Sequence, residues 1–354
     1  MKRIAALMTG LALLGAVSLS PAEAAKKDSF RVAWSIYVGW MPWGYMSDSG
    51  IMKKWADKYG IDVEIVQIND YIESINQYTA GAFDGVSATN MDTLSIPSGG
   101  GIDTTALIVG DFSNGNDAVL VKGDGGFKAL AGKPINLVEL SVSHYLLARG
   151  LESAGMSEAD ISVVNTSDAD MVAAFATPDV QAAVTWNPLV STIMEMPGVS
   201  KIYDSADIPG EIIDLMVVNT ETLADNPAFG KALVGAWYEA MQVMSSDTPA
   251  GIAARESMAA ASGTDLAGYD AQLATTQMFY QPAAAVAFTQ DAKLIQTMDF
   301  VRKFLFEHGI LGEGAQSVDD IGIAFPGGKS LGDKGNITFR FDPTYMQMAA
   351  DGAL

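Results

Sequence analysis

The alternation of apolar runs and amphipathic segments predicts two successive α/β units. In the first unit, short runs rich in β-branched, aromatic and other apolar residues at 30–34, 63–67 and 85–88 are typical of strands. Segments with apolar residues at helical spacing lie between or beside them, at 48–59 and 72–79. Strands that alternate with helices in this way favour a parallel sheet with helices on both faces.

The following part of the chain repeats this order. Residues 104–109 and 118–121 are further predicted strands, and the polar, glycine-containing stretch 111–116 between them indicates a crossover into a second domain. A strand at 215–218 then returns the chain to the first domain, and long helical runs follow it. The remaining predicted elements are strands at 135–139, 161–165 and 182–185 and helices at 145–154, 169–176, 227–246, 249–261, 266–278 and 290–308.

The pattern therefore predicts an α/β fold of two lobes, each a mainly parallel sheet flanked by helices, hinged by crossovers. Residues 1–25 are expected to be a signal peptide, because Lys2 and Arg3 precede a short apolar run and Ala22-Glu23-Ala24 resembles an A-x-A cleavage site. Cleavage near Ala24 or Ala25 would release the protein into the periplasm. The expected domains are 26–115 with 215–354 as lobe 1, and 116–214 as lobe 2.

The composition narrows the classes of partner. The formal net charge is -21, so nucleic acid and anionic membrane surfaces are poor partners, since both favour clusters of Lys and Arg. The chain contains no cysteine, which excludes a disulfide framework and leaves stability to the core. We expect a monomer that binds a small molecule.

Ligands of open α/β sheets lie beyond the carboxyl ends of the strands, so the residues that follow each predicted strand are the candidates. After the first strand, five aromatic residues occur between positions 34 and 45, in a segment interrupted by Gly39, Pro42 and Gly44. We interpret this segment as a loop whose aromatic faces cage a flat or cationic ligand, with core packing as the alternative. Its candidate residues are Trp34, Tyr37, Trp40 and Trp43.

Polar candidates follow the other predicted strands. Ser141 begins a helix, and the free N–H groups of a helix start suit an anion, yet Glu139 places a carboxylate beside them. This conflict argues against an anionic ligand. Asp92 either contacts the ligand or caps the turn that follows it. The remaining candidates are Asn90, Trp186, Asn187 and Asp214, the last of these near the expected hinge.

Four ordered segments resemble the solute-binding proteins of ABC importers in the taurine, aliphatic-sulfonate and thiamine-precursor (NMT1-like) group. They are Ala80-Gly-Ala-Phe-Asp84-Gly, Leu130-Ala-Gly-Lys-Pro134, Ser141-Val-Ser-His-Tyr-Leu-Leu147 and Val184-Thr-Trp-Asn-Pro188. The resemblance implies the two-lobed periplasmic binding protein fold (type II) and an inner-membrane ABC permease as partner. It is greatest for the branch found alongside urea-carboxylase-type enzymes, whose members are described as urea carriers and whose enzymes act on guanidine.

The resemblance and the residues together predict guanidinium as the ligand. Sulfonate binders of this group carry small or basic residues where this chain has Glu139 and Leu140. Guanidinium is planar and cationic and donates hydrogen bonds around its edge, so it favours carboxylates, amide or hydroxyl oxygens and an aromatic face. Asp92, Glu139 and Asp214 are the expected carboxylates, and Asn90, Asn187 and Ser141 the expected edge acceptors. Urea or another small amide is the second hypothesis, and taurine or a similar sulfonate the third.

A hydrolytic enzyme is the remote alternative. With two histidines, His144 and His308, and no cysteine, the chain offers few residues for nucleophilic catalysis or a His/Cys metal site. Phe325-Pro-Gly-Gly-Lys329-Ser330 resembles the end of a phosphate-binding loop, but the glycine expected at 323 is Ile323. We therefore predict no catalytic residue, no metal and no cofactor.

Overall fold

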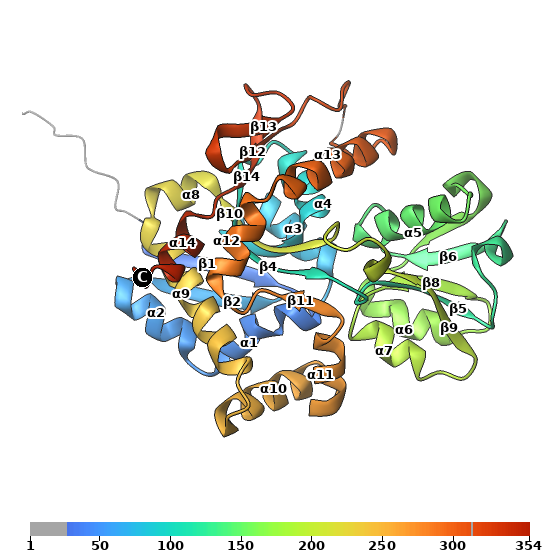
Figure 1. The fold of residues 1–354 in the computed structure, drawn as a ribbon, viewed down its shortest axis with the longest axis horizontal. Helices are drawn as coiled ribbons and strands as arrows, with labels where there is room; N and C mark the ends of the chain where they lie inside the picture. The colour runs from blue at the N-terminus through green and yellow to red at the C-terminus, as the bar shows by residue number, and fades with distance from the viewer. Residues whose placement is uncertain (1–26, 313) are drawn as a thin grey trace, which may run out of the picture.

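A computed structural model describes residues 27–312 and 314–354, and the predicted signal peptide lies outside these ranges. Figure 1 shows two groups of elements side by side, each built on its own sheet. The described residues form one nine-stranded and one five-stranded sheet, both flanked by helices, which confirms the α/β fold class. No helix in this part of the chain is long and apolar enough to cross a bilayer.

The large sheet has the order β13-β12-β14-β4-β10-β3-β1-β2, with β11 paired to β4. Strand β1 is parallel to β2 and β3, whereas β10 is antiparallel to β3 and β4. Its strands are β1 (Ser29–Trp34), β2 (Asp62–Gln67), β3 (Gly85–Thr89), β4 (Thr104–Ser113), β10 (Ile213–Asn219), β11 (Thr276–Met278), β12 (Gly322–Phe325), β13 (Lys329–Leu331) and β14 (Ile337–Phe341).

The small sheet has the order β7-β6-β8-β5-β9. Strand β6 is parallel to β7 and β8, and β5 is antiparallel to β8 and β9. Its strands are β5 (Ala118–Lys122), β6 (Pro134–Leu137), β7 (Ser162–Asn165), β8 (Ala182–Thr185) and β9 (Val199–Asp204). The chain passes between the sheets twice, from β4 to β5 and from β9 to β10.

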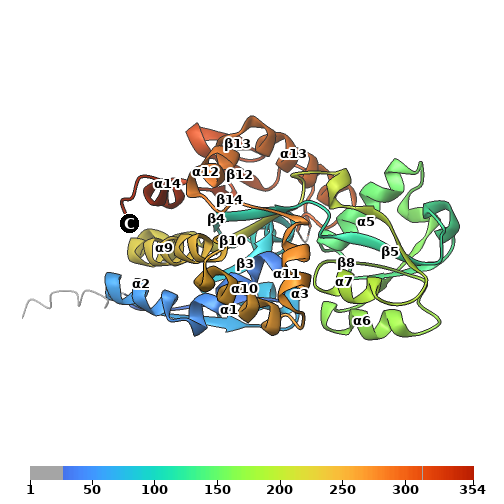
Figure 2. The same ribbon diagram turned by 60° about the horizontal axis from the view of Figure 1, so that its bottom comes forward.

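Helices cover both sheets, and in Figure 2 α5 lies on one side of the small sheet and α6 and α7 on the other. The helices of the large-sheet lobe are α1 (Met41–Asp48), α2 (Ile51–Tyr59), α3 (Tyr71–Thr79), α4 (Asn90–Thr93), α8 (Thr220–Asp225), α9 (Pro227–Met244), α10 (Pro249–Ala261), α11 (Leu266–Leu273), α12 (Pro282–Gln290), α13 (Ala292–Glu307) and α14 (Thr344–Ala350). Those of the small-sheet lobe are α5 (Val142–Ser153), α6 (Asp168–Ala176) and α7 (Leu189–Met194).

Four local expectations need correction. Both sheets are mixed rather than mainly parallel, because the crossover strands β5 and β10 run against their neighbours. The aromatic segment is not a loop: a 3-10 turn at Val38–Trp40 leads into α1, with Pro42 in its first turn, where a missing N–H costs nothing. The helix expected over 266–278 ends at Leu273 and gives way to β11. The other strands and α-helices that were not predicted are strands β9, β12, β13 and β14 and helices α1, α4, α7, α8, α12 and α14.

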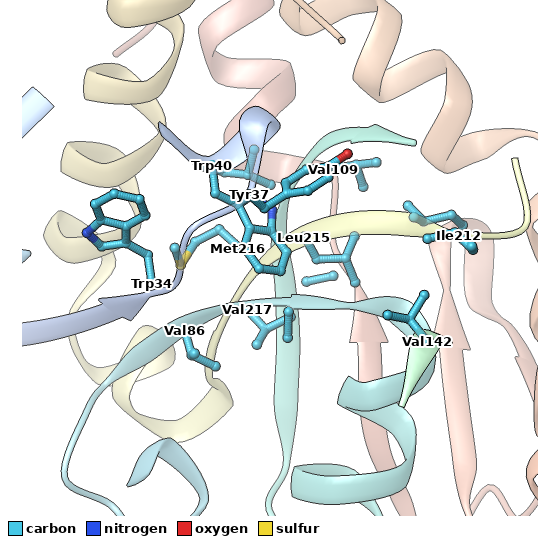
Figure 3. Packing of buried hydrophobic residues seen from close by; sticks show 14 of the residues in the cluster. Trp34, Tyr37, Trp40, Val86, Val109, Val142, Ile212, Leu215, Met216 and Val217 are labelled. Atoms are coloured by element: carbon cyan, nitrogen blue, oxygen red, sulfur yellow. The ribbon is translucent and has the colours of Figure 1, made fainter. Parts of the chain in front are cut away.

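The aromatic segment packs against the middle of the large sheet. Figure 3 shows Tyr37 and Trp40 beside Leu215 and Met216 of β10, with Trp34 standing apart from them. All of these side chains are at most 4% exposed. This packing holds the end of β1 against the strand along which the chain returns from the small sheet.

Candidate ligand site between the two lobes

A small cavity of about 10 Å³, with room for about one water molecule, lies between the lobes. Both lobes and the crossover contribute to its wall. The lining residues are Tyr37, Trp40, Tyr71, Thr89 and Asp214 on elements of the large-sheet lobe, Asp117 in the β4–β5 crossover, and Val142 and Trp186 in the small-sheet lobe. The cavity thus lies where the chain crosses between the sheets, as expected for ligands of this kind of fold.

Four aromatic rings form a continuous wall that bridges the lobes. The ring centroids of Tyr37 and Trp40 are 5.0 Å apart, and Trp40 is 5.6 Å from Tyr71. Tyr71 in turn meets Trp186 of the opposite lobe edge-on at 5.5 Å. The Trp186 indole donates a hydrogen bond to the carbonyl oxygen of Ile36 at 3.2 Å, which fixes this ring across the gap. Aromatic faces and edges arranged in this way can surround a small flat or cationic ligand.

Two carboxyl groups, of Asp117 and Asp214, also line the cavity, and none of the lining residues is Lys or Arg. Each of these aspartates is 3% exposed. Asp117 accepts a hydrogen bond of 2.5 Å from the Ser113 hydroxyl. Burial raises the pKa of Asp117 to about 7, because an ionised carboxylate without a positive partner is poorly solvated there.

Asp111 stands behind Asp214 and forms a carboxyl pair with it. The two residues are directly opposite on the antiparallel strands β4 and β10, which places their carboxyl groups next to each other. The Tyr37 hydroxyl donates to Asp111 at 2.8 Å. A Cβ at Gly39 would come within 2.6 Å of Asp111 Oδ2, so this glycine lets the 3-10 turn approach the carboxyl.

Burial favours the protonated form of the Asp111–Asp214 pair. Burial raises the pKa of Asp111 to about 7, and burial together with the neighbouring Asp111 charge raises the pKa of Asp214 well above its ordinary value. Among the residues that the structure describes, one oxygen of each carboxyl has no hydrogen-bond partner. Two adjacent buried carboxyls that lack a positive partner favour an incoming cation, which would replace the proton.

Asp92 adds a fourth buried carboxyl, directly behind the cavity wall. Its Oδ2 accepts hydrogen bonds from the Tyr71 hydroxyl at 2.7 Å, the Thr89 hydroxyl at 2.9 Å and the Val142 N–H at 3.3 Å. All three donors belong to residues that line the cavity. Burial raises the pKa of Asp92 to about 6, which leaves it mainly ionised at neutral pH.

The structure separates the predicted site residues into groups. Tyr37, Trp40, Trp186 and Asp214 line the cavity, and Asp92 lies behind its wall. Asn90 and Asn187 do not line it: Asn90 accepts the Ile213 N–H and donates to the Glu211 carbonyl, and Asn187 binds Ser191 and Thr275. Both amides therefore stabilise, through hydrogen bonds, the segments near the places where the chain passes between the two sheets.

The other predicted residues lie elsewhere. Trp43 stacks on Trp237 at 5.1 Å in the core, and the Trp34 ring packs against Gly44. Glu139 is exposed, because the strand before it ends at Leu137 and the following turn directs residues 139 and 140 to solvent. Ser141 caps α5 by accepting the Ser143 N–H, so its hydroxyl is already engaged. The expected carboxylate at the cavity is thus not Glu139.

Sequence reasoning missed Tyr71, Asp111 and Asp117. Tyr71 begins the helix after β2, so its position follows the strand-end rule. Asp111 lies in the stretch interpreted as the crossover, and Asp117 directly follows it. Two aspartates six positions apart in a hinge were the available signal for an acidic site.

The histidine that a hydrolytic site would require lies outside the cavity lining. His144 of α5 and His308, at the end of α13, both bind the carboxylate of Glu158 through Nε2. This cluster joins the two lobes away from the four aspartates. Among residues 27–312 and 314–354, no three His, Cys, Asp or Glu side chains are arranged to hold a metal ion.

Two lobes with a buried site between them, crossed twice by the chain, define the fold of periplasmic binding proteins. The profile of the NMT1-like family matches residues 33–261, and the chain belongs to this family. Over 190 residues it is 28% identical to a protein of Brucella abortus (strain 2308) whose name describes it only as a binding protein. That match covers 52% of this chain and 58% of the relative, so the chain spans less than two thirds of the curated relatives it matches.

Solved structures share the fold at low sequence identity. The alkanesulfonate-binding protein SsuA of Xanthomonas axonopodis pv. citri, bound to MOPS, gives a TM-score of 0.67 at 17% identity, covering 82% of this chain and 96% of that one. The periplasmic aliphatic sulphonate binding protein SsuA of Escherichia coli gives 0.65 at 18%, covering 80% and 94%. The periplasmic nitrate-binding protein NrtA of Synechocystis PCC 6803 gives 0.57 at 13%, covering 93% and 99%.

Proposed function

We propose that this protein is the periplasmic substrate-binding protein of an ABC importer, that it captures a small organic cation, and that it delivers this cation to an inner-membrane permease. Guanidinium is the first choice of ligand. The observation that carries the proposal is the acidic, aromatic cavity: Asp117 and Asp214 line it, no Lys or Arg does, and four aromatic rings bridge the lobes beside it.

The charge argues for a cation. Asp111 lies opposite Asp214 and accepts the Tyr37 hydroxyl, and Asp92 accepts the Tyr71 hydroxyl behind the cavity wall, so four buried acidic groups lie around one small space. Burial removes the carboxylates from water and costs them solvation free energy. A bound cation offsets this cost by its attraction to the negative charges. Guanidinium also matches the flat aromatic walls and donates hydrogen bonds to several oxygens at once. Urea has the same shape but no charge, so it leaves the carboxylates uncompensated.

The second candidate is an aliphatic sulfonate, which the similarity in fold to the two sulfonate-binding SsuA proteins favours. A sulfonate in this cavity would meet two lining carboxyls and no basic side chain. Two unit charges of the same sign about 4 Å apart repel by about 4 kcal/mol near a protein surface. We therefore place sulfonates behind the cation.

The test is titration calorimetry of the protein without its predicted signal peptide, using guanidinium chloride, urea and taurine. Millimolar guanidinium is far below the molar range in which it denatures proteins. We expect saturable binding of guanidinium that weakens at least tenfold in Asp117→Asn, whereas Glu139→Gln, which alters an exposed carboxylate, binds as the wild type. Saturable binding of taurine without guanidinium binding would overturn the proposal.

A further inference from the structure

The N-terminus of α5 is occupied by a carboxylate from the other lobe. Asp92 Oδ2 accepts the N–H of Val142, the first residue of the helix, at 3.3 Å. The next two N–H groups are bound within the turn: Ser143 donates to the Ser141 hydroxyl oxygen at 3.2 Å and His144 to the Ser141 carbonyl at 2.9 Å. The protein thus provides its own anion at the place where a helix start would otherwise attract one.

The Asp92 carboxylate is built into the site rather than resting near it. The side chain is 1% exposed, and Tyr71 and Thr89 hold Oδ2 from its own lobe while Val142 holds it from the other. Its Oδ1 has no hydrogen-bond partner in the described part of the chain. A buried carboxylate oxygen without a partner leaves negative potential directed at its surroundings.

This potential reaches the cavity. The Asp92 charge contributes to the raised pKa of Asp117, which lines the cavity. The Tyr71 hydroxyl, which donates to Asp92, belongs to a ring that stands between Trp40 and Trp186 in the aromatic wall. A phenol that donates to a carboxylate has a more electron-rich ring, and such a ring attracts a cation more strongly.

We propose that Asp92 is the residue that determines which ligand charge this site accepts. Its carboxylate takes the position of a ligand oxyanion at the start of α5. The closed site therefore accepts a planar cation and rejects oxyanions and neutral molecules of the same shape. The inference rests on the proposed function and names the feature that sets its substrate class. Asp92 acts through Tyr71, Thr89 and Val142 and is a positioning residue. It also links the two lobes, which makes closure depend on the same carboxylate that attracts the ligand.

The test compares two isosteric pairs. Asp92→Asn removes the charge and keeps an oxygen for Tyr71 and Val142, while urea replaces guanidinium without its charge. Asp168→Asn is the matched control, because Asp168 is also buried and also bonds across the lobes, accepting the Tyr71 N–H at 3.2 Å, but does not line the cavity. Titration calorimetry gives the ratio of the urea and guanidinium Kd values for each protein.

We expect Asp92→Asn to reduce the selectivity for guanidinium over urea by about tenfold or more. Asp168→Asn should change both affinities by the same factor, because it weakens only the contact between lobes. If the wild type binds guanidinium and Asp92→Asn keeps the ratio, the role of Asp92 is overturned and the proposed function stands. If the wild type binds none of these ligands, both fail.

A second measurement needs no variant, in case Asp92→Asn does not fold. Methanesulfonate, a small oxyanion, should leave the melting temperature of the wild type unchanged at concentrations where guanidinium raises it. A rise with methanesulfonate would overturn the role of Asp92 in excluding oxyanions, even if guanidinium also binds.

Discussion

Replacing Asp117 by asparagine should change how the stability of the ligand-free protein depends on pH. Burial raises the pKa of Asp117 from its ordinary value of 3.8 to about 7 in the folded protein. The folded state therefore holds this proton more tightly than the unfolded state. The resulting stabilisation is fully present below pH 4 and is lost as the pH rises through about 7. Asparagine keeps the shape of the side chain and does not titrate.

The magnitude follows from the shift. About two of the three pK units of the shift lie between pH 5 and pH 7, and each unit corresponds to about 1.4 kcal/mol. Between pH 5 and pH 8, the free energy of unfolding of the wild type should therefore fall by about 3 kcal/mol relative to that of Asp117→Asn. For a chain of this size, 1 kcal/mol corresponds to roughly 2 °C in melting temperature. The difference between the two proteins should therefore grow by about 6 °C.

Differential scanning fluorimetry of both proteins at pH 5, 6, 7 and 8 measures this difference directly. Titrating groups far from Asp117, such as His308 beside Glu158, contribute equally to both proteins and cancel, whereas Asp111 and Asp214 titrate differently once the Asp117 charge is removed. The difference in melting temperature between Glu139→Gln and the wild type should stay constant over this pH range, since the Glu139 side chain is exposed. A difference between wild type and Asp117→Asn that stays constant from pH 5 to pH 8 would refute the picture of an uncompensated buried carboxyl.

Three further predictions concern binding. Guanidinium affinity should increase from pH 6 to pH 8, because the Asp111–Asp214 pair, with the pKa of Asp111 raised to about 7, must release a proton to the solvent when the cation binds. Calorimetry in buffers of different ionisation enthalpy should show about one proton released, and no release would contradict this prediction. Trp186→Ala should weaken binding at least tenfold by removing a wall ring and its bond to the other lobe. Trp43→Phe alters the stack on Trp237, so it should lower the melting temperature and leave the Kd for guanidinium within about threefold. A weakened Kd with an unchanged melting temperature would place Trp43 at the ligand.

Some features of this protein are local and were readable from the order of residues. Strands β3 and β8 are short apolar runs between turn signals, and their predicted positions differ from the observed ones by at most one residue. The return strand near 215 was also recognised, because apolar periodicity is set by which face each residue buries. The crossover was expected at 111–116, but β4 extends to Ser113, so the link occupies 114–117. The same local logic selected Tyr37, Trp40 and Trp186 after strands and Asp214 at the start of the return strand, and all four line the cavity.

Other features depend on contacts between distant parts of the chain. Gly39, Pro42 and Gly44 suggested a loop, yet the segment is partly helical: Pro42 fits the first turn of α1, and Gly44 gives room for the Trp34 ring. From the sequence, Trp43 was indistinguishable from a cavity residue. In the structure it stacks on Trp237 of α9 in the core. Glu139 looked like the critical carboxylate because it precedes the helix start, but its side chain faces solvent.

By itself, then, the sequence determined the α/β lobes, the crossovers and the aromatic composition of the site, since these follow from periodicity over a few neighbouring residues. Only the tertiary structure decided which acids make the site. Asp111 and Asp214 are 103 positions apart and become neighbours through the pairing of β4 with β10. Asp92 and Val142 meet through the contact between lobes. Burial then gives these carboxyls their raised pKa values, because loss of water around a charge depends on the whole surrounding fold and not on adjacent residues.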